Sequence, residues 1–128
     1  MIRIQLANDK PPIDVASAVE MDEFLDRATQ GLIHNLPVII SITVHGHALD
    51  CGLGLPEGFV QIQAESGESC FVTVGDTEAD GIVEFYLFGT HHTEIPRRHL
   101  IPAMEMRQVV REFVETGVPS SIVAWEQV

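Results

Sequence analysis

The chain has 128 residues, enough to bury a core without disulfide or metal support, and its 45% hydrophobic and 20% charged residues are typical of a folded protein. Its formal net charge of -12 argues against nucleic acid and anionic membranes as direct partners, because phosphate groups are bound by clustered Lys and Arg. No Lys or Arg occurs between Arg27 and Arg97, so the middle of the chain is uniformly acidic and favours a basic partner.

We expect one domain spanning residues 1–128. The longest apolar stretch, residues 36–44, is far shorter than the roughly 20 residues that a membrane-spanning helix needs. Residues 1–9 lack the basic and apolar regions of an export signal, which favours a cytoplasmic protein. Cys51 and Cys70 lie in alternating apolar segments, where free thiols are expected in a reducing compartment.

The N-terminal part predicts a short strand followed by a helix. Ile2, Ile4 and Leu6 alternate with polar neighbours, which is typical of a strand. Ser17 and Glu20 have the spacing of a capping box, in which both side chains accept hydrogen bonds from free backbone N–H groups at a helix start. The first helix is therefore expected to begin at this point.

The first helix is predicted from an apolar stripe with the 3.6-residue period. The stripe leaves Asp22, Glu23, Asp26 and Arg27 pointing outward, and Gly31 is its expected stop. Its members are Met21, Phe24, Leu25, Ala28 and Leu32.

From residue 38 to residue 88 the apolar period changes to two, which predicts five consecutive half-buried strands. Short segments with Gly and Pro separate these strands, so neighbouring strands are expected to pair as antiparallel hairpins in a meander. The five apolar sets are Ile40, Ile42 and Val44; Leu49, Cys51, Leu53 and Leu55; Val60, Ile62 and Ala64; Cys70, Val72 and Val74; and Val83, Phe85 and Leu87.

A second helix is expected to start at Pro102 and to end at Gly117, and residues 122–125 then form a last strand or an extended tail. Segments in the order helix, strands, helix predict an α+β fold: an antiparallel meander of about five to seven strands with both helices packed on one face. The apolar stripe of the second helix consists of Met106, Val109, Val110 and Phe113.

One chemical alternative is a small cupin-like metal-binding protein. His45 and His47 lie at an expected hairpin tip, and His91 and His92 lie on a later segment. Paired histidines with a carboxylate are common metal ligands, and Asp50 would have to supply that carboxylate. The Gly and Pro residues of the second cupin motif are missing, so the spacing only half fits.

Catalytic motifs do not appear in the sequence. There is no Ser or Cys in a strained glycine-flanked turn beside a base, and no glycine-rich phosphate loop before a helix. We therefore expect a protein that is not an enzyme, has no cofactor and acts by binding. A homodimer that pairs through an exposed sheet face stays an open alternative.

The order of several short motifs resembles the first immunity-protein family of bacterial polymorphic toxin systems, which is common in actinobacteria. The likeness covers most of the chain. The matching motifs are Gly52-Leu53-Gly54, Phe71-Val72-Thr73-Val74-Gly75-Asp76, Val83-Glu84-Phe85-Tyr86 with Gly89, Glu94-Ile95-Pro96, Ile101-Pro102, Arg111-Glu112-Phe113, Thr116-Gly117, Pro119 and Val123-Ala124-Trp125-Glu126.

The resemblance implies an antidote that is made with its toxin and binds it tightly enough to occlude its active site. Toxins paired with this family are often deaminases that act on nucleic acid. The acidic composition agrees with this, because a toxin of that kind needs a basic substrate groove that an acidic protein can block. Our hypothesis for the toxin-binding residues is the set Asp76, Glu78, Asp80, Glu84, Tyr86 and Glu94.

Overall fold

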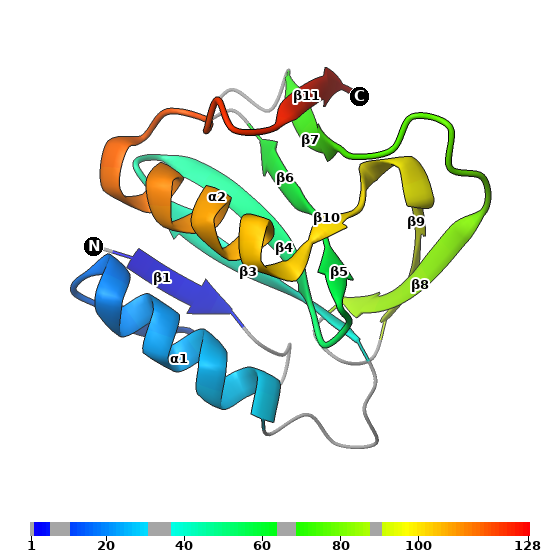
Figure 1. Ribbon diagram of the computed structural model, residues 1–128. Helices are drawn as coiled ribbons and strands as arrows, with labels where there is room; N and C mark the ends of the chain where they lie inside the picture. The colour runs from blue at the N-terminus through cyan, green and yellow to red at the C-terminus, as the bar shows by residue number, and fades with distance from the viewer. Residues whose placement is uncertain (1, 6–10, 31–36, 64–68, 88–90) are drawn as a thin grey trace.

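The structure is a computed structural model that describes residues 2–5, 11–30, 37–63, 69–87 and 91–128. Two helices lie side by side on one face of a sheet that has nine strands within the described residues (Figure 1). This confirms the expected α+β class, and the sheet has more strands than expected. Six residues that the sequence motifs used, Leu6, Gly31, Leu32, Ala64, Phe88 and Gly89, lie outside the described ranges.

The helices are α1 (Ala18–Gln30) and α2 (Ala103–Thr116). The strands of the large sheet are β1 (Ile2–Gln5), β2 (Ile13–Val15), β3 (Val38–Val44), β4 (His47–Leu53), β6 (Val60–Gln63), β7 (Cys70–Val74), β8 (Ile82–Leu87), β9 (His91–Pro96) and β11 (Ala124–Gln127). The short strands β5 (Glu57–Gly58) and β10 (Ile101–Pro102) form a separate antiparallel pair, and η2 (Arg97–His99) is a 3-10 turn.

The predicted meander is present from β3 through β4 and β6 to β7, all paired antiparallel. The last segment is a strand, because β11 pairs antiparallel with β7. β8 departs from the expected hairpin order. Over the described ranges, β8 does not pair with β7. It pairs in parallel with the start of β3, where Tyr86 is opposite Val38, and antiparallel with β9.

The strand β9 is not among the strands that the alternating apolar residues predict. Ile95 is the one buried residue of this strand, and the four residues before it are polar or titratable. A strand with so few buried side chains carries no clear alternating signal. Its position is determined by pairing with β8 along its whole length.

Helix α1 begins where its sequence predicts, and helix α2 begins and ends there too; the predicted stop of α1 at Gly31 lies outside the described residues. The backbone N–H of Glu20 donates to Ser17 Oγ at 3.2 Å, and the Glu20 carboxylate accepts from the N–H of Ala16 at 2.7 Å, as in a capping box. Helix α2 follows Pro102 and ends at Gly117, whose φ of 76° is left-handed and suits glycine. Neither described helix is long and apolar enough to span a membrane.

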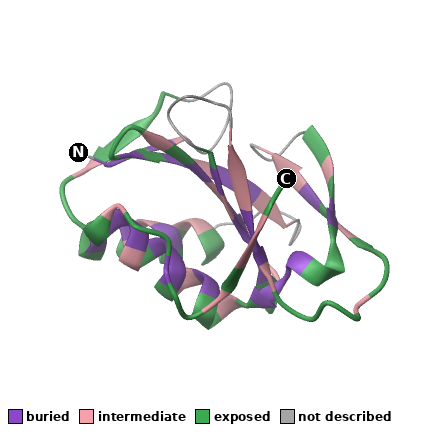
Figure 2. Ribbon diagram, turned by 90° about the horizontal axis from the view of Figure 1, so that it is seen from above, coloured by how far each residue is buried: buried purple, intermediate pink, exposed green. Residues whose placement is uncertain are grey.

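The main core lies between the helices and the sheet. Met21 and Leu25 of α1 and Val109 and Phe113 of α2 are almost fully buried there against strands β1, β3, β4 and β6. Figure 2 shows the buried residues gathered on the helix sides that face the sheet. Packing of these apolar side chains supplies the main driving force for folding.

A second, smaller core lies on the opposite face of the sheet, under the hairpin of β8 and β9. Phe59 and Phe85 meet there edge to face, with ring centroids 5.3 Å apart. Gly52 makes room for both rings, because a Cβ atom at this position would lie 2.6 Å from Phe85 and 2.8 Å from Phe59. The hairpin therefore packs closely against this part of the sheet.

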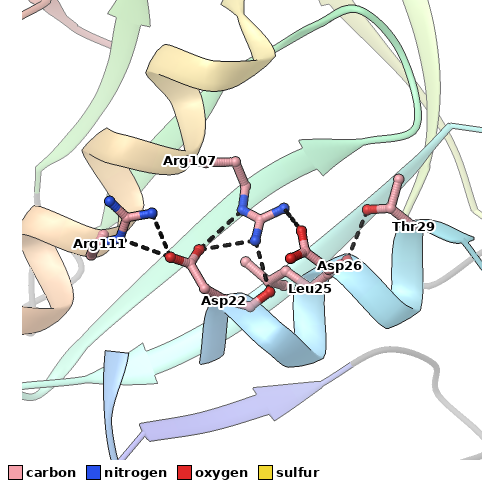
Figure 3. Close-up of polar contacts among 6 residues, drawn as sticks. All are labelled: Asp22, Leu25, Asp26, Thr29, Arg107 and Arg111. Carbon is pink, nitrogen blue, oxygen red and sulfur yellow. Dashed lines mark hydrogen bonds and ion pairs between the residues drawn. The ribbon is translucent and has the colours of Figure 1, made fainter. Parts of the chain in front are cut away.

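An ion-pair network joins the two helices (Figure 3). Arg107 of α2 donates to Asp22 Oδ1 at 2.9 Å, to the Asp22 carbonyl at 2.8 Å and to Asp26 Oδ1 at 2.9 Å. Arg111 donates to the other Asp22 oxygen at 2.7 Å. The expectation that Asp22 points to solvent is wrong: its side chain is only 18% exposed, because it faces α2.

Candidate partner-binding surface

The acidic loop joins β7 to β8 and contains three exposed carboxylates, those of Asp76, Glu78 and Asp80. Its start is fixed by Gly75, whose N–H donates to the Arg98 carbonyl at 2.7 Å. A Cβ atom at Gly75 would lie 2.0 Å from the Leu100 carbonyl oxygen, so only glycine fits there.

The loop itself is shaped by Asp76. Its carboxylate accepts the backbone N–H of Glu78 at 3.0 Å, and its carbonyl accepts the N–H of Ala79 at 3.0 Å. This is an Asx-type turn, which holds the backbone while the carboxylates of Glu78 and Asp80 stay exposed. The loop therefore presents its negative charge from a defined backbone.

The hairpin of β8 and β9 continues this acidic surface. Glu84 and Glu94 are directly opposite each other, and Tyr86 is opposite His92, so these four side chains share one face. His92 Nε2 lies 3.2 Å from Glu84 Oε1. Two carboxylates in opposite positions repel each other, so this face is electrostatically suited to a cation.

A groove of about 530 Å³ runs beside the acidic loop. Asp76 contributes to its lining, and so do Glu57 and Glu105, which the sequence analysis did not single out. The pairing of β5 with β10 brings Glu57 next to the start of α2, and Glu105 lies in the first turn of that helix. An acidic residue in a first helical turn is common, so its position gave no functional signal.

The predicted residues thus fall into two adjoining groups. Asp76, Glu78 and Asp80 lie on the loop, which Figure 1 shows at the right-hand side of the molecule leading into β8. Glu84, Tyr86 and Glu94 lie on one face of the hairpin that follows. Glu57 and Glu105 extend the negative charge to the groove behind the loop.

The histidines of the metal-binding alternative are not brought together. His47 pairs with Val44 at one end of β3, whereas His92 pairs with Tyr86, which pairs with Val38 at the other end. β3 has seven residues, or about 20 Å at roughly 3.3 Å per residue. In the described parts of the chain, no three His, Cys, Asp or Glu side chains form a group that could hold a metal ion.

His45 and His47 instead pack against α2. His45 Nε2 lies 2.8 Å from the Val114 carbonyl near the end of the helix, and both imidazole rings meet the Phe113 ring edge to face. A histidine hydrogen-bonded to a C-terminal helical carbonyl satisfies a group that the helix leaves free. The metal-binding alternative therefore has no support.

Both cysteines are free thiols, as expected. Burial raises the pKa of the Cys51 thiol to about 12, with the neighbouring Asp50 charge as a smaller cause. A thiol with so high a pKa is not a nucleophile at neutral pH. Cys70 Sγ accepts a hydrogen bond from Gln61 Nε2 at 2.9 Å.

A model of the family described as immunity protein Imm1 matches residues 9–127. The chain belongs to the Imm1 immunity-protein family. No curated protein is significantly similar to it in sequence. Membership in Imm1 agrees with the resemblance found in the motifs, and it places the acidic loop and the hairpin inside the matched region.

Proposed function

We propose that this protein binds the toxin that is produced with it and occludes the toxin's active site. The toxin belongs to a polymorphic toxin system and is a basic protein that acts on nucleic acid, such as a deaminase. The antidote works by binding and not by catalysis, in the cytoplasm where the toxin is made. Membership in the Imm1 family supports this role.

The acidic surface is the observation that carries the proposal. Among the described residues, no Lys or Arg lies within ion-pair distance of Asp76, Glu78, Asp80 or Glu94. These carboxylates can therefore pair with cations of a partner. A groove that binds a phosphate backbone carries clustered Lys and Arg. The acidic loop and hairpin are complementary to such a groove and compete with its substrate there.

A co-purification experiment tests the proposal. The protein is immobilised and exposed to lysate of its own organism at low and moderate salt, and captured proteins are identified by mass spectrometry. We expect one stoichiometric basic partner with a toxin domain, whose recovery falls as salt rises. The absence of any stoichiometric partner at both salt concentrations contradicts the proposal.

A further inference from the structure

The sheet face opposite the helices is only partly covered. At the end near β8 it is buried under the hairpin, where Ile39, Phe85 and Ile95 belong to the second core. Beyond that core, the strand register places Asp50 between Ser41 of β3 and Gln61 of β6, and all three side chains are half-buried. The next positions outward, Thr43, Ala48 and Gln63, are exposed.

A groove of about 160 Å³ opens at the boundary between the covered and uncovered parts. Its walls include Phe59, Leu87 and Ile95, and its polar groups include Asp50 and Gln61. One water molecule needs only about 10–15 Å³ of such space, so the groove is large enough to admit a long side chain. It is thus an apolar recess with a carboxylate at its side.

The negative charge of Asp50 has few stabilising partners in this position. Its Oδ1 accepts a hydrogen bond from the Ser41 hydroxyl at 2.5 Å, and no other hydrogen bond or ion pair reaches it from the described residues. Burial raises the pKa of Asp50, and the Ser41 hydrogen bond offsets this only in part. Arg3 lies on the same sheet face but is held by Asp14 at 2.9 Å.

A half-buried carboxylate that lacks a cation costs folding free energy, so its presence has to be explained by something other than stability. The apolar walls of the groove and the free Asp50 oxygen match one kind of occupant. Arginine has a planar, weakly hydrated guanidinium that binds carboxylates, and an aliphatic stem that packs against apolar surface. Proteins that act on nucleic acid carry such side chains in their substrate grooves.

We propose that the uncovered sheet face is a second contact surface for the toxin, in which one arginine of the toxin enters this groove and pairs with Asp50. This inference rests on the proposed function and adds a contact separate from the acidic loop. The loop's exposed charges act over a distance and govern association, whereas the Asp50 pair is desolvated in the complex and governs dissociation.

Binding kinetics with the purified toxin test the inference. Wild type, Asp50→Asn and the matched control Glu115→Gln are compared, because Glu115 is exposed on α2 and its change removes the same charge. Asparagine keeps an oxygen for the Ser41 hydroxyl, so the fold is retained, and a thermal melt verifies this. We expect Asp50→Asn to dissociate about 30-fold faster or more, with association within about twofold, and Glu115→Gln to match wild type.

The outcomes separate the two proposals. If wild type binds the toxin and all three proteins dissociate from it at the same rate, the Asp50 inference is overturned and the proposed function stands. No binding by wild type overturns both. The wild-type protein could instead form a homodimer that is lost in the Asp50→Asn variant. That result assigns the face to a second copy of this chain and overturns its assignment to the toxin.

Discussion

Gly52 is the residue on which the packing of the second core depends most directly. A methyl group added there meets the rings of Phe85 and Phe59 well inside contact distance. We predict that Gly52→Ala lowers the free energy of unfolding by about 1–3 kcal/mol, the usual cost of overpacking a core. Urea unfolding measures this. The control Ala48→Val, exposed on the same strand, is expected to stay within about 0.5 kcal/mol of wild type.

A second prediction concerns how Asp50 makes the folding stability depend on pH. Its folded-state pKa lies above the ordinary value of 3.8, so the folded state holds the proton more tightly than the unfolded state. Folding stability therefore falls as pH rises through the folded-state pKa, and the cost persists at neutral pH. We expect Asp50→Asn to raise the melting temperature at pH 7 relative to Glu115→Gln, and the gain to shrink toward pH 4. A lower melting temperature at pH 7 contradicts this.

At the scale of elements, the contact between α1 and α2 depends on Arg107. Its side chain is 19% exposed and makes several charged hydrogen bonds, whereas Arg111 is 47% exposed. We predict that Arg107→Met lowers the free energy of unfolding by about 1.5–3 kcal/mol, because Asp22 is left half-buried without its main partner. The control Arg111→Met is expected to cost at most about 1 kcal/mol. Equal costs in urea unfolding contradict this interpretation.

The sequence predicted the elements whose signals are local. Capping by Ser17 marks the start of α1, and the left-handed turn at Gly117 marks the end of α2. The alternating apolar residues identify the strands β3, β4, β6, β7 and β8. The parts it missed depend on distant partners. β9 is stabilised by pairing along β8, and Asp22 turns inward because Arg107 lies 85 residues later.

At the scale of the whole molecule, the uneven charge predicts steered association with a basic toxin. We propose the variant Asp76→Asn with Glu78→Lys and Asp80→Lys, in which asparagine preserves the hydrogen bond that shapes the loop. Its association rate at low salt is expected to fall about tenfold or more, and the difference to shrink at high salt. Surface plasmon resonance at two salt concentrations measures it.

The control for this variant carries the same change in charge on the helices: Glu112→Gln, Glu23→Lys and Glu115→Lys. It is expected to slow association less than the loop variant, because charge near the contact matters more than net charge. Equal slowing by both variants would remove the acidic loop from the binding surface.

Part of the candidate surface could be predicted from the sequence, because some of its residues are close together in the chain, as they are in the helices and strands. Exposed carboxylates in a turn such as Asp76 to Asp80 can be identified from local sequence. Glu57 and Glu105 join them only through the pairing of β5 with β10, and the groove beside Asp50 forms only because β8 returns to β3. These contacts join distant parts of the chain and leave no local pattern.

We expect binding of this protein to silence the toxin, and a titration of toxin activity measures that effect. The purified toxin is assayed on its substrate while this protein is added in increasing amounts. We expect activity to fall linearly and to vanish at one molecule of this protein per toxin. A toxin that keeps its full activity while this protein is bound in saturating excess contradicts inhibition by binding.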